Sequence, residues 1–268
     1  MNKLSFIRTI AVAVAAIVIC GCGAVPLTGR KQILLVSDQE VYEAGLTQYK
    51  DYMQQAKLSS DVKASAMVKS VGRKLAEATE QYLRANGLES ELSNLSWEFS
   101  LVENDQVNAF CLPGGKIVVY DGLLSVAQNE AELAVVIGHE IGHAVAKHSN
   151  ERMSQQILAN YGMAILSQAL SDKSASVRTV ATSVFGLGAQ VGLMLPYSRK
   201  HEYEADYMGI VFMEIAGYDS SSAVDFWTKM SAGNGNATDF LSTHPNDAKR
   251  IAEIKRRLDE AKSIAKTL

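Results

Sequence analysis

The sequence lacks the features that mark several classes of protein. Its 26 basic and 29 acidic residues give a formal net charge of −3, and no stretch is rich in lysine or arginine, so nothing favours nucleic-acid binding. No internal repeat or low-complexity tract is evident. At 268 residues the chain can bury one substantial core, which predicts one main domain.

Acidic residues are absent before Asp38, and the N-terminus has the layout of a secretory signal peptide. Two basic residues precede an apolar run from Ile10 to Ile19, which is short for a membrane-spanning helix. The run leads to Cys22, which follows a glycine and resembles the lipidated cysteine of a bacterial lipoprotein. We predict a lipoprotein-type signal peptide over residues 1–21. An uncleaved signal anchor or soluble secretion is the alternative.

Cysteine is also scarce, with three residues in the chain. If Cys22 carries lipid, Cys111 is the only thiol of the mature protein, which excludes an intramolecular disulfide. We interpret Cys111 as a small packed residue near the functional site, with a redox role as the alternative.

The hydrophobic pattern then divides the chain into helices and strands. Residues 22–36 are expected to be a tether and lead-in, and a capping box at Ser37 opens a predicted helix that ends near Lys57. A second helix is predicted from Asp61 to about Ala85. Alternating apolar residues next predict a short antiparallel sheet, with strands over 97–101, 107–112 and 116–120.

The most informative stretch is a predicted helix that begins after Asn129. Its polar residues within an apolar run are His139, Glu140 and His143, and their spacing places them on neighbouring parts of one face. In this His-Glu-x-x-His pattern, two imidazoles one turn apart hold zinc, and the glutamate acts on the attacking water. The alternative is a buried helix whose histidines form ordinary hydrogen bonds.

A second cluster of acidic residues can complete such a site. On a helix Glu202 and Asp206 are four residues apart and share a face, whereas Glu204 points elsewhere and His201 is expected to be exposed. Zinc held by two histidines needs a third protein ligand, for which we choose Glu202. Asp206 is placed to accept a hydrogen bond from the far nitrogen of a ligand histidine. The alternative is a solvated acidic face.

Three further segments leave their roles open. Residues 151–195 are apolar at helical intervals and are interpreted as a core or lid segment; Val177 to Leu195 is interrupted too often for a membrane span. Asn108, Ala109 and Phe110 lie on a predicted strand that could hold an extended peptide, or they are ordinary sheet. His244 precedes a proline and could be a helix cap, a donor to an oxyanion or a removable zinc ligand.

Taken together, these stretches resemble the peptidase family of HtpX and the CAAX prenyl proteases, in its lipid-anchored soluble-domain branch. The likeness rests on residues 26–30, on Asn108-Ala109-Phe110 with residues 113–115, on His139 to His143, on Ser198-Arg199 with Glu202-x-x-Ala205-Asp206, and on His244-Pro245 followed by Arg250. It implies a gluzincin-type site, with zinc on His139, His143 and Glu202, Glu140 as general base and Asp206 behind the ligands. It also implies that His244 is an active-site residue.

The resemblance implies an α+β, mainly α, metalloprotease domain over residues 37–268, with a small antiparallel sheet beside the zinc helix. We expect a zinc-dependent metalloendopeptidase with one Zn²⁺ per chain, lipid-anchored through Cys22 and facing the periplasm. Its expected substrates are unfolded or misassembled envelope proteins. The competing classes are a non-proteolytic, chaperone-like zinc lipoprotein and a zinc hydrolase of a cell-wall amide; digestion of casein beside peptidoglycan discriminates between them.

Overall fold

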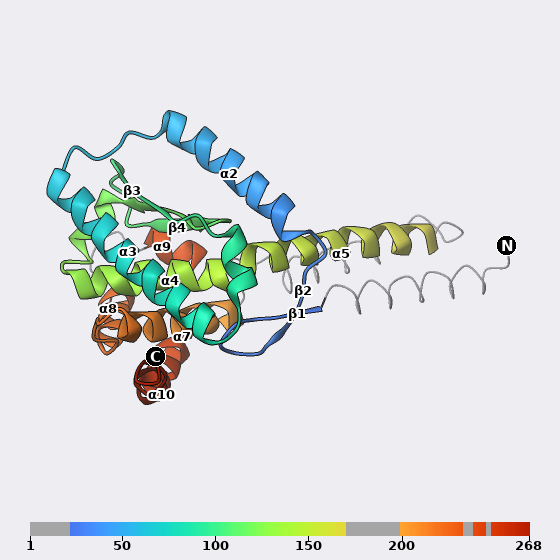
Figure 1. The fold of residues 1–268 in the computed structure, drawn as a ribbon. Helices are drawn as coiled ribbons and strands as arrows, with labels where there is room; N and C mark the ends of the chain where they lie inside the picture. Colours follow the sequence, from blue (N-terminus) through green and yellow to red (C-terminus); the bar gives the residue numbers. More distant parts are fainter. Residues whose placement is uncertain (1–21, 170–198, 233–237, 245–247) are drawn as a thin grey trace. The chain divides into compact units, whose positions relative to one another are not determined.

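The computed structural model describes residues 22–169, 199–232, 238–244 and 248–268 (Figure 1). The chain is mainly helical, as predicted, and has two small sheets, of which the pair β1 and β2 was not predicted. The predicted signal peptide and the segment Val177 to Leu195 lie outside the described residues. Within the described ranges, none of the helices has both the length and the apolar character that crossing a bilayer requires.

The elements are β1 (Cys22–Ala24), β2 (Lys31–Ile33), α2 (Asp38–Gln55), α3 (Val62–Ala85), η1 (Glu89–Asn94), β3 (Glu98–Val102), β4 (Ala109–Leu112), β5 (Lys116–Tyr120), η2 (Asp121–Ser125), α4 (Glu130–Val145), α5 (His148–Ala169), α7 (Arg199–Ile215), α8 (Ser222–Ser231), α9 (Thr238–Thr243) and α10 (Ala248–Ala265).

The chain divides into two compact units, and the first contains the described residues 22–37 and 149–169. In this unit β1 and β2 pair as antiparallel strands. Arg30 donates to both carboxylate oxygens of Glu151, over 2.9 and 2.7 Å. The amide of Leu35 donates to the hydroxyl of Ser154. These contacts tie the segment around β2 to the start of α5. The predicted limits, 22–36 and 37–268, stay predictions.

The second unit contains residues 38–148 and the described part of residues 196–268, including a sheet of three strands in the order β3, β5, β4. β4 and β5 form the predicted antiparallel hairpin, whose turn has Gly114 and Gly115 at positive φ. β3 and β5, however, run parallel. The prediction of a wholly antiparallel sheet was therefore wrong, because β5 lies between β3 and β4 instead of β4 following β3 across a hairpin.

The centre of the second unit is the contact between α4 and α7. A Cβ atom on Gly142 would lie 2.6 Å from the carbonyl oxygen of Ala205, and one on Gly209 would lie 3.0 Å from the backbone of Gly138. The absence of side chains at these positions lets the two backbones approach closely. α3, β4 and α8 also pack on α4, so nearly all of that helix is buried. The sheet therefore lies beside the predicted zinc helix.

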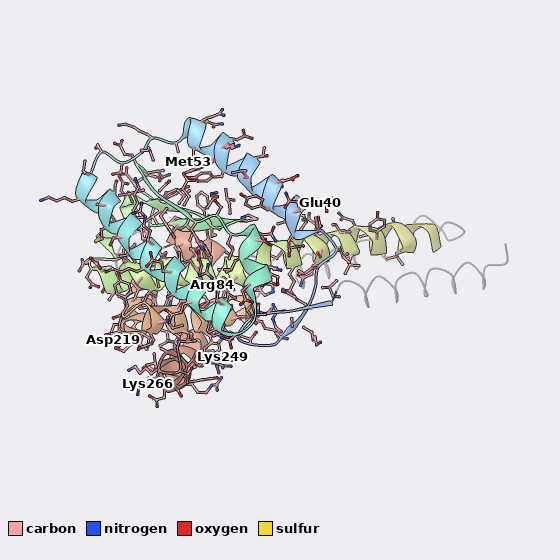
Figure 2. All side chains as sticks on the ribbon, viewed as in Figure 1. Glu40, Met53, Arg84, Asp219, Lys249 and Lys266 are labelled. Atoms are coloured by element: carbon pink, nitrogen blue, oxygen red, sulfur yellow. The ribbon has the colours of Figure 1, made fainter. Side chains whose placement is uncertain are left out.

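α10 packs against α7 and α8 and has a charged outer face. Figure 2 labels Lys249 and Lys266, which are exposed near the two ends of this helix. Arg250 follows Lys249 directly but is fully buried. One charged residue of this helix therefore belongs to the interior, although its neighbours are solvated.

Candidate metal centre

α4 begins where the sequence predicted. Asn129 is its N-cap, and its side-chain oxygen accepts from the amide of Glu132 over 2.9 Å. The carboxylate of Glu132 in turn accepts from the amide of Gln128. Ten residues further along, this helix presents His139, Glu140 and His143, all of them at most 3% exposed. A well-defined start therefore fixes which residues face the interior.

α7 brings the two predicted carboxylates to the same place. Glu202 is fully buried, and its two carboxylate oxygens each lie 3.4 Å from the Nε2 atom of one histidine, His139 or His143. The close approach of α4 and α7 at Gly142 makes these distances possible. Glu202 is thus positioned as the sequence predicted for a third ligand.

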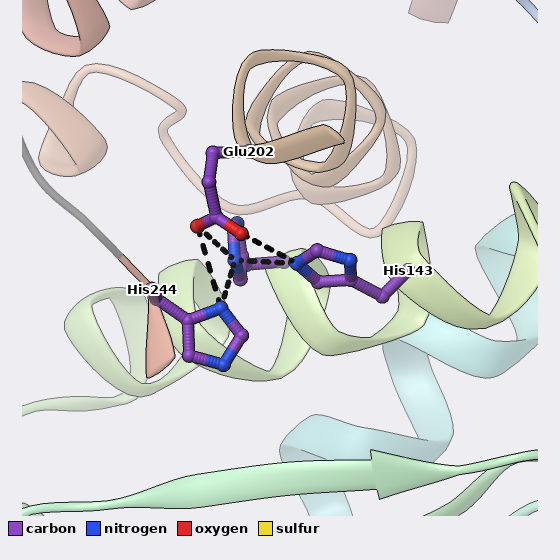
Figure 3. Close-up of side chains that lie close together, drawn as sticks. His143, Glu202 and His244 are labelled. Carbon is purple, nitrogen blue, oxygen red and sulfur yellow. Dashed lines mark hydrogen bonds and ion pairs between the residues drawn. The ribbon is translucent and has the colours of Figure 1, made fainter. Parts of the chain in front are cut away.

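His244, directly after α9, completes a group of four side chains (Figure 3). Its Nδ1 atom lies 3.1 Å from Nε2 of His139 and 3.3 Å from Oε2 of Glu202. One potential ligand atom from each of His139, His143, Glu202 and His244 lies within 4.8 Å of all the others. Of the alternatives left open for His244, the geometry favours a place in the site.

The donor set fits a metal ion of borderline softness. Both carboxylate oxygens of Glu202 are buried without a hydrogen-bond partner among the described residues; Arg250 lies 3.2 Å from Oε2, and a cation bound at the group would offset the burial of Oε1. Imidazole nitrogens with one carboxylate are typical zinc ligands, and three protein ligands are typical of catalytic zinc. The four side chains can therefore hold one zinc ion.

Asp206 and Arg250 support the group behind His139. Oδ1 of Asp206 lies 2.8 Å from Nδ1 of His139, the predicted contact. Arg250 donates to both oxygens of Asp206 and lies 3.2 Å from Glu202. Its guanidinium also stacks on Trp227, 3.6 Å from the ring centroid. The sequence indicated Arg250 only as part of the family likeness, and its role between two carboxylates was missed.

The pKa values of these groups follow from burial and from the Arg250 charge. Burial raises the pKa of both carboxyl groups, but Arg250 and the neighbouring histidines together outweigh it, so the pKa of Asp206 is lowered and that of Glu202 lies well below its usual range. Burial lowers the pKa of His143 well below its usual range. Burial and Arg250 also act to lower the pKa of His139, but Asp206 and Glu202 outweigh them and raise it to about 9. The carboxylates therefore stay ionised, as ligands and their supports must.

Glu140 lies beside the group without joining it. Its Oε1 atom is 3.5 Å from Nε2 of His244 and has no hydrogen-bond partner among the described residues. Burial raises the pKa of Glu140, while the charges of His244 and His139 and, to a smaller extent, the backbone amide of Cys111 counter that rise. Cys111 is partly buried, and burial raises the pKa of its thiol well above the usual range. A neutral thiol agrees with the packed role predicted for Cys111.

One prediction about this region was wrong. His201 was expected to be exposed, but it is 4% exposed, and its ring stacks on His148 with centroids 4.2 Å apart. Glu204 is not a member of the candidate ligand group, yet it is buried as well and bonds to His148. The error arose because α7 is enclosed on both sides, so a polar residue off the metal face is not solvated.

The sequence is similar to known peptidases, in agreement with the metal centre described above. A family model described as Peptidase family M48 matches residues 68–258. The mitochondrial metalloendopeptidase OMA1 of Arabidopsis thaliana is 42% identical over 168 residues, which is 62% of this chain and 33% of the relative. OMA1 of Schizosaccharomyces pombe is 39% identical over 64% of this chain and 50% of the relative. The beta-barrel assembly-enhancing protease of Escherichia coli is 28% identical over 63% of this chain and 36% of the relative. The chain therefore spans about a third to a half of the length of these relatives.

Proposed function

Because the chain belongs to Peptidase family M48, whose members are zinc metallopeptidases, we propose that it is a zinc-dependent metalloendopeptidase. The observation that carries the proposal is the buried group of His139, His143, Glu202 and His244 with the carboxylate of Glu140 beside it. A zinc site that serves only structure does not need this additional carboxylate. The position of Glu140 therefore favours hydrolysis over zinc binding alone.

His139, His143 and Glu202 are the proposed zinc ligands, with Asp206 fixing the orientation of His139. Bound zinc polarises the scissile carbonyl group and lowers the pKa of water. Glu140 takes the proton of the attacking water at Oε1, which has no hydrogen-bond partner among the described residues, and delivers it to the leaving amine. A carboxylate with a raised pKa suits both halves of this proton transfer.

The two ring nitrogens of His244 face different parts of the site. Its Nδ1 atom faces the ligand atoms, and its Nε2 atom faces Glu140. It can therefore occupy a fourth ligand position, or donate a hydrogen bond to the oxyanion once substrate takes that position. We propose that it serves in one of these two roles, as a removable fourth ligand or as a donor to the oxyanion.

The proposed substrate-binding strand is the segment Asn108, Ala109 and Phe110. The amide of Tyr120 donates to the carbonyl of Asn108, so pairing with β5 extends to the first of these residues. Within the described sheet, β4 is an edge strand. Because the amide of Cys111 acts on Glu140, this edge passes beside the proposed base. A peptide added along it would bring its backbone to the metal group.

We further propose a site of action in a bacterial envelope. Cys22 is the proposed lipid attachment point, which would hold the protein on a membrane, facing the periplasm. One of the relatives is named as a beta-barrel assembly-enhancing protease, which supports envelope proteins as targets. Unfolded or misassembled envelope proteins are the proposed substrates, within a role in protein quality control.

The proposed activity is tested by zinc content and casein cleavage of the wild type beside Glu140→Gln. We expect both proteins to bind about one zinc and only the wild type to cleave, because Glu140 is a base and not a ligand. Glu130→Gln, an exposed change in the first turn of the same helix, is the control and should cleave normally. Absence of zinc from the wild type, or equal cleavage by Glu140→Gln, would contradict the proposal.

A further inference from the structure

A second buried cluster, formed by His148, Glu204 and His201, lies behind His143. We propose that His148 and Glu204 are positioning residues, which hold the imidazole of His143 in the tautomer and orientation that zinc binding requires. The proposal rests on the proposed function, in which His143 is a zinc ligand. It adds two residues that are not among the four candidate ligands and do not belong to the His-Glu-x-x-His pattern.

The cluster is a chain of short contacts between buried groups. The Nδ1 atom of His148 lies 2.8 Å from Nδ1 of His143, and its Nε2 atom lies 3.0 Å from Oε2 of Glu204. His148 is fully buried and Glu204 is 7% exposed. His201 stacks on the His148 ring, with 26° between the ring planes. The His148 ring is therefore fixed at both nitrogens and on one face.

Hydrogen-bond chemistry assigns a donor and an acceptor to each contact between His143, His148 and Glu204. Nε2 of His143 faces the metal group, so metal binding there leaves the proton on Nδ1. His148 must then accept at its Nδ1 atom, which leaves its own proton on Nε2. The carboxylate oxygen Oε2 of Glu204, 3.0 Å from Nε2 of His148, is placed to accept that proton's hydrogen bond. Glu204 thus selects the tautomer of His148, and His148 selects that of His143.

The backbone places His148 by an unusual turn. α4 ends at Val145, and Lys147 has φ of 56°, in the left-handed region. This residue redirects the chain so that His148 can open α5 with its ring against His143. The side chain of Lys147 is held by Asp38 at 2.7 Å and Glu91 at 2.6 Å. The turn is therefore anchored independently of the metal group.

Two variants of His148 with similar size separate the proposed role from simple packing. In His148→Asn the side-chain oxygen can take the place of Nδ1 as acceptor, whereas His148→Leu fills the space without an acceptor. We expect His148→Leu to weaken zinc binding by about 10- to 100-fold, the usual loss when a partner of a ligand histidine is removed. His148→Asn should lie within about threefold of the wild type, since the bond from His143 is kept.

Glu204→Gln completes the test because it keeps the shape and removes the charge. Its amide can offer either a donor or an acceptor to His148, so it no longer selects one tautomer, and zinc affinity should fall by about 10-fold. If Glu204 acts through His148, the double variant His148→Leu/Glu204→Gln should bind zinc as weakly as His148→Leu alone. Independent packing effects would multiply instead, and that result would overturn the proposal.

The measurement is competition for zinc with a chromophoric chelator on the folded full chain. Visible spectra of the cobalt-substituted proteins serve as a second readout, and those of His148→Leu and Glu204→Gln should differ from the wild type. Tyr207→Phe, on the same helix α7, is the matched control, because it removes a partly buried hydrogen bond to Glu260 of α10 and should leave both readouts unchanged.

The outcomes separate the two proposals. Wild-type affinity and spectrum in both His148→Leu and Glu204→Gln would overturn the positioning role and leave the proposed activity intact. Equal losses in His148→Asn and His148→Leu would also overturn it, because the acceptor would then not matter. Failure of the wild type to bind zinc would remove the proposed function, and this inference with it.

Discussion

The two histidines of α4 are supported in different ways. His139 contacts Asp206, whose charge is balanced by the buried guanidinium of Arg250. His143 contacts a second imidazole, His148, and only through it reaches the carboxylate of Glu204. The support of His139 is therefore an ion pair close to the metal group. The support of His143 is a series of two hydrogen bonds, in which the carboxylate lies one imidazole ring further from the metal group.

The difference follows from charge balance. Glu202 and Asp206 are two carboxylates one turn apart in the interior, and without a cation each would be protonated or excluded from it. Arg250 lies between them, and both carboxylates raise its own pKa although burial lowers it. A neutral imidazole needs no such counter-charge. We therefore expect the His139 side to control folding stability, and the His143 side mainly zinc affinity.

The largest effect is expected from Arg250→Leu. It leaves two buried carboxylates without their guanidinium, and removal of one partner of such a buried pair typically costs about 3–5 kcal/mol. The free energy of unfolding of the metal-free protein, measured in urea, should fall by this amount.

The control for this change is Arg257→Leu on the same helix. Arg257 also stacks on an aromatic ring, that of Tyr207, and pairs with Glu260, but its side chain is 32% exposed. Its loss should cost about 1 kcal/mol or less, because exposed ion pairs contribute little. Equal losses for the two arginine variants would show that buried charge balance does not distinguish Arg250.

Asp206→Asn compares the two supports directly. The amide oxygen can still accept from His139, but the charge that faces Arg250 is lost. Zinc affinity should fall by about 10- to 100-fold, and further than in Glu204→Gln, because Asp206 contacts the ligand itself. Chelator competition on both variants provides the test. A larger loss in Glu204→Gln would mean that the relay through His148 matters more to zinc binding than the direct contact of Asp206.

Gly142→Ala should disturb both supports at once. The new Cβ atom would lie 2.6 Å from the oxygen of Ala205, the residue between Glu204 and Asp206. Forcing the helices apart should cost about 1–3 kcal/mol of unfolding free energy. In Gly209→Ala the nearest atom is 3.0 Å away, so the loss should be smaller. Equal stability of Gly142→Ala and the wild type would show that α4 and α7 can separate without cost.

The sequence predicted the parts of this site that local spacing determines. His139, Glu140 and His143 share a helix face, and Glu202 and Asp206 share another, so each of the two sets follows from the helical period. The start of α4 at Asn129 followed from capping chemistry. The short distances between the candidate ligands on α4 and the one on α7 also depend on the small residues that let the two helices approach.

What the sequence left open depends on contacts between distant segments. Arg250 lies among exposed charged residues of α10, and nothing in that pattern marks one of them as buried. The strands were recognisable by alternation, but the order β3, β5, β4 depends on how the connection between β3 and β4 crosses the sheet. The pairing of His148 with His143 depends on a left-handed residue that is not glycine, which local propensity disfavours.

Substitutions of Lys147, the left-handed residue before His148, are expected to have the smallest effect on stability, and this effect is confined to the surroundings of His143. Lys147→Gly and Lys147→Ala both remove the ion pairs with Asp38 and Glu91, but only glycine adopts φ of 56° without steric cost. Lys147→Gly should therefore be the more stable variant by about 0.5–1 kcal/mol in urea unfolding, although alanine is the better helix former. Greater stability of Lys147→Ala would mean that the chain can enter α5 without this conformation. The fixed position of His148 would then need a cause other than the turn.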